Sequence, residues 1–285
     1  MTKSVLITGT STGFGMETAL YLAERGFQVY ATMRDLARRS ELDAEAARRH
    51  AAVQVLRLDV TEPGSIREAV ETVVRESGGV YGLVNNAGLF LRGYFEDLTD
   101  AEIRRVFETN LFGTMAVTRA VLPHMRAARR GRIIVISSVA GRVGAPAGSA
   151  YSSSRFAQEG FAESLYQELQ PLGVYVTLIE PGITKTESWT LDRGVAAKAR
   201  DPVSPYYPWF CRSEQLFDRA MQTSPITPRD VAKAVYKALT AARPRLRYIV
   251  GRRAELVVTL RRYLPDKLFE RWYFGKIMRR LTDAR

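Results

Sequence analysis

The sequence predicts an α/β fold in which helices flank a doubly wound parallel sheet of about seven strands. Short β-branched runs alternate with helical segments along the first two-thirds of the chain, and strands that alternate with helices of this length form right-handed crossovers. No internal repeat divides the 285 residues. We therefore expect one domain over residues 1–285, with a lid-like insertion at about 183–226 and a basic C-terminal extension at about 251–285.

Six short apolar runs have the pattern of buried parallel strands. They are residues 5–8, 29–32, 53–56, 82–85, 133–136 and 175–179, and residues 246–250 form a weaker seventh candidate. Helical patterns fill residues 15–25, 36–49, 64–77, 100–129, 151–170 and 228–241. Thr227 can cap the last of these helices, and Pro228 suits its first turn. Sheets of this kind bind ligands at the carboxyl ends of their strands.

The insertion breaks this rhythm. It combines four prolines with six aromatic residues: Pro202, Pro205, Pro208, Pro225, Trp189, Tyr206, Tyr207, Trp209, Phe210 and Phe217. The segment is too aromatic for a plain linker and too rich in proline for one long helix. We expect either a lid over an apolar pocket or a satellite hydrophobic cluster under a long loop.

The composition is that of an ordinary globular protein, with 46% hydrophobic and 25% charged residues. No apolar run approaches the ~20 residues that span a bilayer, and the first predicted strand begins too early to leave room for a signal peptide. A single cysteine, Cys211, cannot form an intrachain disulfide, and two histidines make a metal cluster implausible. We expect a cytoplasmic protein without a metal.

The formal net charge of +12 is concentrated at the C-terminal end of the chain. Residues 243–285 hold thirteen Lys and Arg against four Asp and Glu. Arginines alternate there with apolar residues, so a helix would be basic and amphipathic. Such a helix suits either peripheral contact with a membrane surface or docking beside a substrate pocket with its arginines outward. Nothing besides charge supports a nucleic-acid partner, and we expect none.

A glycine-rich turn joins the first predicted strand to the first predicted helix. It reads Thr8-Gly9-Thr-Ser-Thr-Gly13-Phe-Gly15. Glycines permit the tight turn and a close approach of the backbone to a pyrophosphate, while the helix N-terminus supplies N–H donors. The spacing differs from the shorter Gly-x-Gly-x-x-Gly fingerprint, but its position favours a dinucleotide site.

Further motifs follow in a familiar order. They are Asp59-Val60, Asn85-Asn86-Ala87-Gly88, Asn110, Ser138, Tyr151 and Pro181-Gly182. With the glycine turn, they make residues 3 to about 186 resemble the short-chain dehydrogenases/reductases, which have a Rossmann-type fold. The stretch 29–35 looks most like the hydroxysteroid and retinol dehydrogenase branch. Helices near 100–129 and 151–170 form the family's usual oligomer interface, so the resemblance implies a homodimer or homotetramer.

The resemblance also implies a set of residues that bind a nicotinamide dinucleotide. Asp59 would hold the adenine, Asn85 to Gly88 would line the cleft, and Pro181 to Ile183 with Thr186 would contact the nicotinamide end. The full set is Gly9, Ser11, Thr12, Gly13, Phe14, Gly15, Arg34, Asp59, Val60, Asn86, Ala87, Gly88, Tyr151, Arg155, Pro181, Gly182, Ile183 and Thr186.

The end of the second strand favours NADP(H) over NAD(H). Enzymes that bind the free ribose 2′-hydroxyl usually place a carboxylate there, whereas this strand is followed by Arg34. A guanidinium presents a forked set of donors to a 2′-phosphate. Arg38 and Arg39 could strengthen the field, and Asp35 is the competing signal for NAD(H).

Ser138 and Tyr151 are the candidate catalytic pair. In the family the tyrosine is the general acid/base, and the serine hydrogen-bonds the substrate oxygen. Hydride addition to a carbonyl leaves an alkoxide that must gain a proton. A free phenol, with a pKa of about 10, suits that task at neutral pH only if a nearby cation lowers its pKa.

The family's lysine, four residues after the tyrosine, is replaced here by Arg155. An arginine one turn away keeps a permanent charge on the same helix face and could bind the nicotinamide ribose, but it effectively cannot release a proton. In the family, Asn110 and a water connect the lysine to solvent. With Arg155 we expect that relay to be interrupted.

Three interpretations follow. The chain is a working, slower oxidoreductase; or it binds the cofactor and catalyses an isomerisation, elimination or cyclisation; or it has lost catalysis and acts as a cofactor-sensing partner. The aromatic insertion, with Phe90, Leu91, Tyr94 and Phe95, favours a bulky apolar carbonyl or secondary alcohol as substrate, although these rings could equally be core or lid packing.

Overall fold

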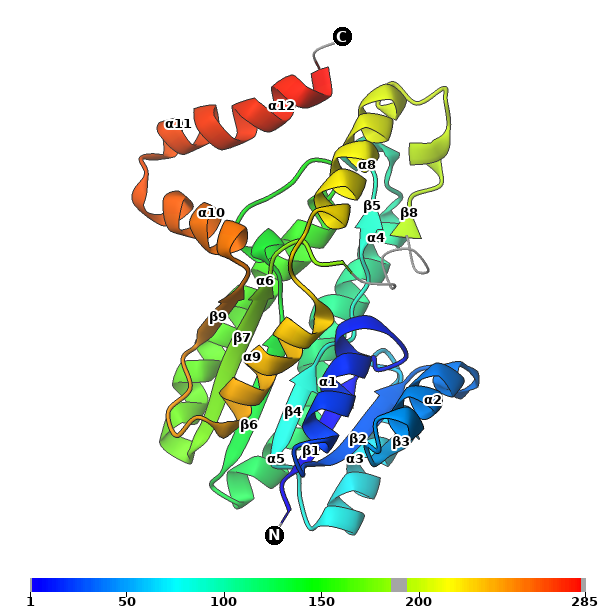
Figure 1. Ribbon diagram of the computed structural model, residues 1–285, viewed down its shortest axis with the longest axis vertical. Coiled ribbons are helices and arrows are strands. Elements are labelled where there is room, and N and C mark those ends of the chain that lie inside the picture. Colours follow the sequence, from blue (N-terminus) through cyan, green and yellow to red (C-terminus); the bar gives the residue numbers. More distant parts are fainter. Residues whose placement is uncertain (1, 186–193, 283–285) are drawn as a thin grey trace.

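A seven-stranded parallel sheet forms the centre of the molecule (Figure 1). The computed structural model describes residues 2–185 and 194–282. The strand order is β3-β2-β1-β4-β6-β7-β9, which confirms the predicted fold class and all seven predicted strands. The strands are β1 (Ser4–Thr8), β2 (Gln28–Met33), β3 (Val53–Arg57), β4 (Gly82–Asn85), β6 (Gly131–Ile136), β7 (Val174–Pro181) and β9 (Arg247–Val250).

Helices cover both faces of this sheet. One face packs against α1 (Gly13–Ala23), α2 (Ser40–Arg48) and α9 (Pro228–Thr240), and the other against α3 (Pro63–Ser77), α5 (Gly113–Ala127) and α6 (Ser149–Leu169). Successive strand residues point to opposite faces, so Val5 and Ile7 enter the first core while Leu6 enters the second. Burial on both faces explains why the strands are apolar throughout rather than alternating.

The helical stretch predicted at 100–129 is broken by one wider turn. It comprises α4 (Asp100–Phe107), a π-helical turn at Glu108–Phe112, and α5. Thr99 caps α4 in a capping box with Glu102. The π turn contains Asn110, which is fully buried. Such turns occur frequently at functional sites, and this one places the Asn110 side chain against the backbone of Leu89 after β4.

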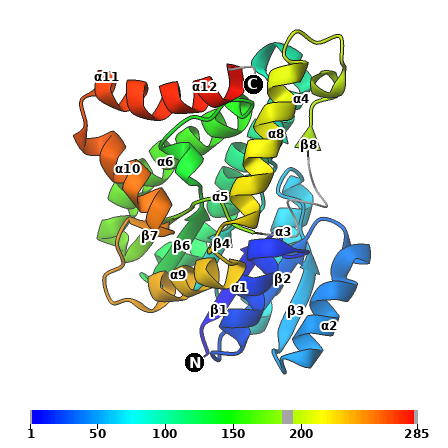
Figure 2. The ribbon, with the colours of Figure 1, turned by 45° about the horizontal axis from the view of Figure 1, so that its top comes forward.

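The insertion and the C-terminal extension lie together above the carboxyl ends of the strands (Figures 1 and 2). The insertion holds α8 (Tyr207–Gln222) and the short strand β8 (Gly194–Val195), which pairs with β5 (Leu91–Arg92). The extension forms α10 (Arg252–Tyr263), α11 (Asp266–Phe269) and α12 (Gly275–Thr282). The sequence pattern did not predict α8, whose first turn accommodates Pro208. Within the described ranges, no helix has the length and apolarity to cross a membrane.

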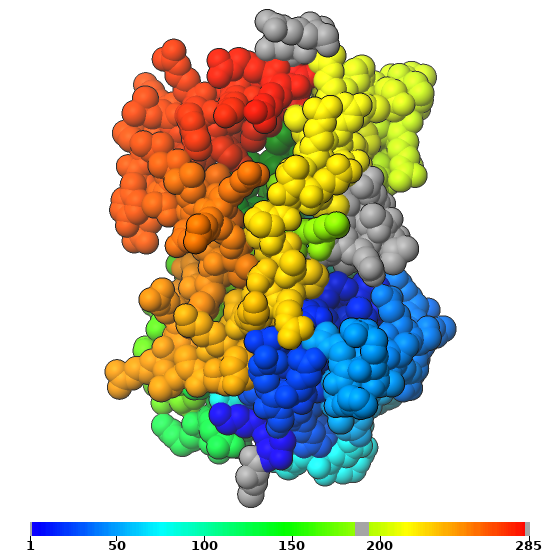
Figure 3. Space-filling view, in the orientation of Figure 1, coloured from blue at the N-terminus to red at the C-terminus, as the bar shows by residue number. Residues whose placement is uncertain are grey.

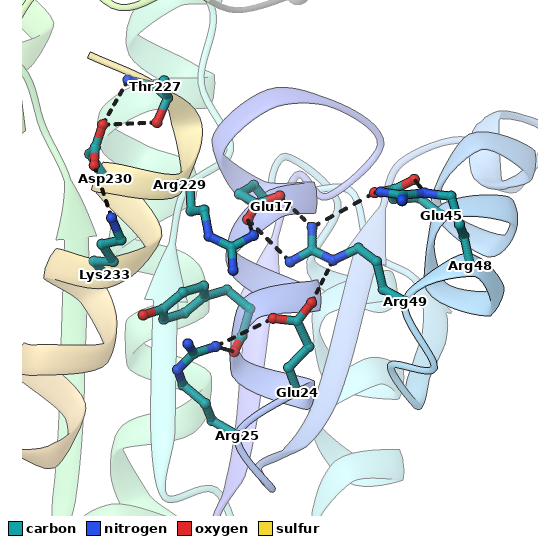
Figure 4. Close-up of polar contacts among 11 residues, drawn as sticks. Glu17, Glu24, Arg25, Glu45, Arg48, Arg49, Thr227, Arg229, Asp230 and Lys233 are labelled. Carbon is teal, nitrogen blue, oxygen red and sulfur yellow. Dashed lines mark hydrogen bonds and ion pairs between the residues drawn. The ribbon is translucent and has the colours of Figure 1, made fainter. Parts of the chain in front are cut away.

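Ion pairs join α1, α2 and α9 (Figure 4). Arg49, which is 10% exposed at the end of α2, lies 2.6 Å from carboxylate oxygens of both Glu17 and Glu24 on or beside α1. At the start of α9, the Asp230 carboxylate accepts hydrogen bonds from the backbone N–H (3.0 Å) and the hydroxyl (2.8 Å) of Thr227. The predicted start of this helix at Thr227 and Pro228 is therefore confirmed.

Candidate active site

A cavity of about 2360 Å³ opens at the carboxyl ends of the central strands. This volume is more than twice the ~1,000 Å³ at the upper end for a single-ligand pocket, so it has room for a dinucleotide and a substrate together. Most of the residues predicted for the site line it: Gly9, Ser11, Thr12, Phe14, Arg34, Asp59, Val60, Asn86, Ala87, Gly88, Ser138, Tyr151, Pro181, Gly182 and Ile183. Four predicted residues do not line the cavity themselves: Gly13 and Gly15 in the glycine turn, and Asn110 and Arg155 behind the lining residues. Thr186 lies outside the described residues.

The glycine turn is held against the turn after β4. Gly9 has φ +71°, and a Cβ there would stand 2.8 Å from the Ala87 Cα. The Asn86 side-chain amide donates to the carbonyl oxygens of Thr8 (2.9 Å) and Gly9 (2.8 Å). A Cβ on Gly15 would meet the Gly9 carbonyl and the Asn86 amide. The first turn of α1 starts beside the lining residues Thr12 and Phe14 and has no acidic residue, so its free N–H groups are suited to an anion.

Ser138 and Tyr151 both line this cavity. Ser138 follows β6 and accepts a hydrogen bond from the Ala140 N–H (3.1 Å), which leaves its own hydroxyl hydrogen for a ligand. Tyr151 lies in the first turn of α6, where the Phe90 ring packs edge-on against it with centroids 4.4 Å apart. The phenol is thereby fixed in direction by an apolar neighbour on the substrate side.

Arg155 lies behind Tyr151 and is only 7% exposed. Its guanidinium carbon is 4.9 Å from the centroid of the Tyr151 ring. Nη1 donates to the Ile136 carbonyl (2.9 Å) and to Oε1 of Gln158 (2.7 Å). Nη2 faces the lining turn so closely that a Cβ on Gly88 would stand 2.7 Å from it. The guanidinium is thus a fixed positive charge beside the phenol ring.

Asn110, which the family resemblance assigns to a proton relay, has a backbone carbonyl that is fully engaged by protein groups. It accepts from Nε2 of Gln158 (2.5 Å) and from the hydroxyl of Thr114 (2.7 Å). Two bonds use both lone pairs of a carbonyl oxygen. The Asn110 side chain meanwhile bridges the Leu89 backbone and Ser154. Gln158 therefore occupies the route behind the arginine. Its position three residues after Arg155, on the same helix face, was the available sequence signal.

Arg34 lies at the cofactor end of the cavity with 68% of its side chain exposed. Its Nε is 4.0 Å from the Asp59 carboxylate, which also accepts from the N–H and hydroxyl of Thr61. Asp35, the competing signal, accepts from the Ala37 N–H at 3.0 Å and so caps the 3-10 turn at Leu36–Arg39. One of its carboxylate oxygens is thereby used by the backbone.

A buried acidic pair lies beneath the catalytic residues. Glu180 in β7 has no exposed surface, and Arg142 (3.2 Å) and Arg247 (3.1 Å) pair with it. Arg247 also pairs with Glu159 (3.0 Å), one turn after Arg155 on α6. Burial, with the charge of Glu159, raises the pKa of Glu180 to about 7, although both arginines oppose the shift. Sequence reasoning missed this pair, because Glu159 on α6 and Glu180 on β7 come together only in the fold.

The substrate end of the cavity is apolar with one buried ion pair. Phe90 and Phe217 lie with ring centroids 6.0 Å apart, and Tyr273 and Ile277 come from the C-terminal extension. Arg92, only 3% exposed, lies 2.8 Å from Glu214 of α8. The extension therefore docks over the substrate end, one of the two positions expected from its sequence, but Arg252, Arg253 and Arg280 line the cavity and so its arginines are not all directed outward.

Comparisons with known proteins agree with this geometry. A family model for short chain dehydrogenases matches residues 3–193. Retinol dehydrogenase 8 of Bos taurus is 36% identical over 93% of this chain and 86% of its own length. Human 17-beta-hydroxysteroid dehydrogenase type 1 is 38% identical over 87% of this chain and 77% of its own. These relatives confirm the resemblance to the hydroxysteroid and retinol branch.

Solved structures of the same fold hold either nucleotide. A short-chain dehydrogenase/reductase from Burkholderia phymatum, in complex with NAD, has a TM-score of 0.80 and covers 100% of this chain and 98% of its own. At 22% identity this is a similarity of fold. ElxO with NADP bound has a TM-score of 0.74 with 25% identity, covering 88% of this chain and 97% of that one.

Proposed function

The chain belongs to the short-chain dehydrogenase family, and from that premise we propose that it is an NADP(H)-dependent oxidoreductase acting on a carbonyl or secondary alcohol of a bulky apolar substrate. The observation that carries the proposal is the placement of Ser138 and Tyr151 on the wall of the cavity that the glycine turn also lines, with the Arg155 charge 4.9 Å from the phenol ring.

The residues present fit a nicotinamide dinucleotide, which supplies or accepts the hydride when bound. In the reductive direction, Tyr151 gives its proton to the carbonyl oxygen while the Ser138 hydroxyl donates a hydrogen bond to it. The negative charge left on the phenol is offset by Arg155. The spent proton returns from the cavity side, because the Asn110 carbonyl behind the arginine is already bonded to Gln158 and Thr114.

The preference for NADP(H) rests on Arg34, whose exposed guanidinium is free to turn toward a 2′-phosphate while Asp35 caps the neighbouring turn. Arg34→Gln should lower the ratio of kcat/KM for NADPH over NADH about ten- to hundredfold, since charge-assisted bonds to phosphate are among the stronger polar contacts. Arg39→Gln is the matched control, because Arg39 pairs with Asp43 at 2.7 Å and does not line the cavity.

The catalytic assignment is tested by cofactor oxidation with a panel of retinoid, steroid and aryl ketone carbonyls. Tyr151→Phe should reduce turnover by about 10² or more without weakening NADPH binding in proportion, and Ser138→Ala should reduce it less. Unchanged turnover in Tyr151→Phe would refute the assignment.

A second candidate is cofactor binding with a reaction other than hydride transfer. It is favoured by one observation: the cation beside Tyr151 is an arginine that cannot exchange a proton, and Gln158 fills the position behind it. Comparison of the wild type with the double variant Arg155→Lys/Gln158→Ala decides between the two, because Gln158 occupies the Asn110 carbonyl behind the cation. Turnover in the wild type that rises in the double variant supports a slowed redox enzyme, whereas no turnover in either, with tight NADPH binding, supports the second candidate.

The homo-oligomer that we propose would form through α5 and α6. Phe112 and Phe156, on the π turn before α5 and on α6, are 50% and 47% exposed, which is unusual for large apolar residues on two neighbouring helices. Phe156→Arg should dissociate the oligomer on gel filtration. Peripheral membrane contact through the extension is tested by co-sedimentation of the full chain with anionic vesicles.

A further inference from the structure

The surface is hollowed between α8 and the C-terminal helices α10 and α12 (Figure 3). This hollow, which we call the mouth, is lined by Leu216, Arg219, Ala220, Thr223, Arg253 and Arg280 and has a volume of about 590 Å³. Four of these residues, Leu216, Ala220, Arg253 and Arg280, also line the large cavity. The mouth is therefore continuous with the substrate end of the site.

Three cations line the mouth, and a fourth, Lys276, lines the large cavity one helical turn before Arg280. Arg219 comes from α8, Arg253 from α10, and Lys276 and Arg280 from α12; all four side chains are exposed. Among the described residues, no carboxylate pairs with any of the four. Glu214, the nearest acidic lining residue on α8, is bound to Arg92 at 2.8 Å, and Asp230 is bound to Thr227 and Lys233.

Such an arrangement costs electrostatic energy, because like charges around a low-dielectric cleft repel one another and focus a positive potential into it. An anion in the mouth would relieve that repulsion. Behind the cations the lining becomes apolar, with Val257, Tyr273 and Ile277 leading toward Phe90 and Phe217.

The cations do not belong to the dinucleotide site. Arg34 and the glycine turn lie beside β1, β2 and α1, whereas α10 and α12 lie above the β7 and β9 side of the sheet (Figures 1 and 2). Arg212 holds the two sides of the mouth together by donating to the Leu281 carbonyl at 2.6 Å. The cavity thus has Arg34 near the glycine turn and a separate group of cations at the mouth.

We propose that the substrate is an amphiphile: an apolar chain or ring system that carries the reacting carbonyl or alcohol at one end and a carboxylate or phosphate at the other. The anionic group lies among Arg219, Arg253, Lys276 and Arg280, and the apolar part reaches inward to Tyr151. This inference rests on the proposed function, since it assigns the substrate class of the same site.

The test uses medium-chain oxo acids and their methyl esters, which share a ketone and a chain and differ in one negative charge. The wild type should favour the acid over its ester by about tenfold in kcat/KM, which corresponds to about 1.4 kcal/mol. The double variant Arg253→Gln/Arg280→Gln should bring that ratio close to one. The matched control is Arg262→Gln/Arg279→Gln, which removes the same charge from the same two helices at exposed positions outside the mouth. A wild type without preference, or equal loss in both double variants, overturns the proposal.

A binding measurement separates this proposal from the proposed function. Intrinsic tryptophan fluorescence, to which the cavity-lining Trp272 contributes, reports binding of an alkyl carboxylate, an alkyl phosphate and a neutral alkyl amide even if no hydride transfer occurs. An anionic substrate is supported if an anion binds more tightly than the amide and only Arg253→Gln/Arg280→Gln abolishes this difference. Comparison of the two anions distinguishes a carboxylate from a phosphate. The proposal is wrong if the two anions bind no more tightly than the neutral amide. If, in addition, anionic vesicles bind the protein and both double variants weaken that binding equally, the cations serve a membrane surface instead.

Discussion

Replacement of Gln158 by leucine tests whether this residue positions the charge of Arg155. The change keeps a buried side chain of similar size but removes the acceptor 2.7 Å from Nη1 of Arg155. It also removes the amide that donates to the Asn110 carbonyl (2.5 Å) and the Thr114 hydroxyl (3.0 Å). A hydrogen bond to a charged group contributes about 1.5–3 kcal/mol, and a neutral one about 0.5–1.5 kcal/mol. We expect the free energy of unfolding to fall by about 3 kcal/mol.

Turnover should fall as well, because a guanidinium that has lost one of two anchors no longer holds its position beside Tyr151. A loss of about 1.4–2.7 kcal/mol of transition-state stabilisation corresponds to a ten- to hundredfold decrease in kcat. The assay is NADPH oxidation with the best carbonyl of the panel, run beside urea unfolding. Gln167→Leu, on the exposed face of the same helix, should change neither quantity.

A double-mutant cycle distinguishes positioning from a purely structural role. If Gln158 acts through Arg155, the effects of Gln158→Leu and Arg155→Lys on kcat should be strongly non-additive, while their effects on stability need not be. Additive effects on kcat, or wild-type kcat and stability in Gln158→Leu, would refute the reasoning.

Three further changes have defined outcomes. The pKa of Glu180 is about 7 in the folded protein, against an ordinary value of 4.5, so between these pH values the folded protein binds more protons than the unfolded chain. Its free energy of unfolding should therefore fall by up to about 3 kcal/mol as the pH rises from about 4.5 to about 7. Glu180→Gln should flatten this dependence in urea unfolding, and a wild type with no such fall would contradict the buried acid. Arg49→Met should lower the free energy of unfolding by about 2–3 kcal/mol, because it leaves the charges of Glu17 and Glu24 uncompensated. The Arg48 side chain is 70% exposed, so Arg48→Met should lower it by less than about 1 kcal/mol in thermal unfolding. Gly88→Ala places a Cβ 2.7 Å from the Arg155 guanidinium and should lower kcat at least tenfold, while Gly64→Ala, with open space around it, should leave kcat unchanged.

The sheet could be predicted from the sequence because each strand is a short apolar run buried on both faces, which is a local signal. The glycine turn, Ser138 and Tyr151 are local motifs too, and the structure brings them to one cavity. The helix α8 could not be predicted, since its stability depends on packing against Tyr94 and on the Arg212 contact with Leu281 rather than on its proline-rich sequence.

The surroundings of Arg155 show a different limit of sequence reasoning. The replacement of lysine was visible, but the partners of the guanidinium come from β6, α6 and the turn after β4, and only folding brings these together. The Glu159 and Glu180 pair is hidden for the same reason: β7 and α6 are separate elements, and neither glutamate has an unusual neighbour in the chain.

The environment of Arg155 argues against a decayed lysine site. Two hydrogen bonds fix Nη1, the missing Cβ of Gly88 accommodates Nη2, and Gln158 fills the space up to the Asn110 carbonyl, although the buried Nε has no hydrogen-bond partner among the described residues. These features suit the larger, planar guanidinium and would fit an ammonium group poorly. The arrangement keeps a permanent charge beside Tyr151 and closes the route behind it. It therefore follows that Arg155→Lys alone should not restore a relay. Only together with a smaller residue at 158, such as Gln158→Ala, would the Asn110 carbonyl be open to water, and a rise in kcat confined to that double variant would identify Gln158 as the block.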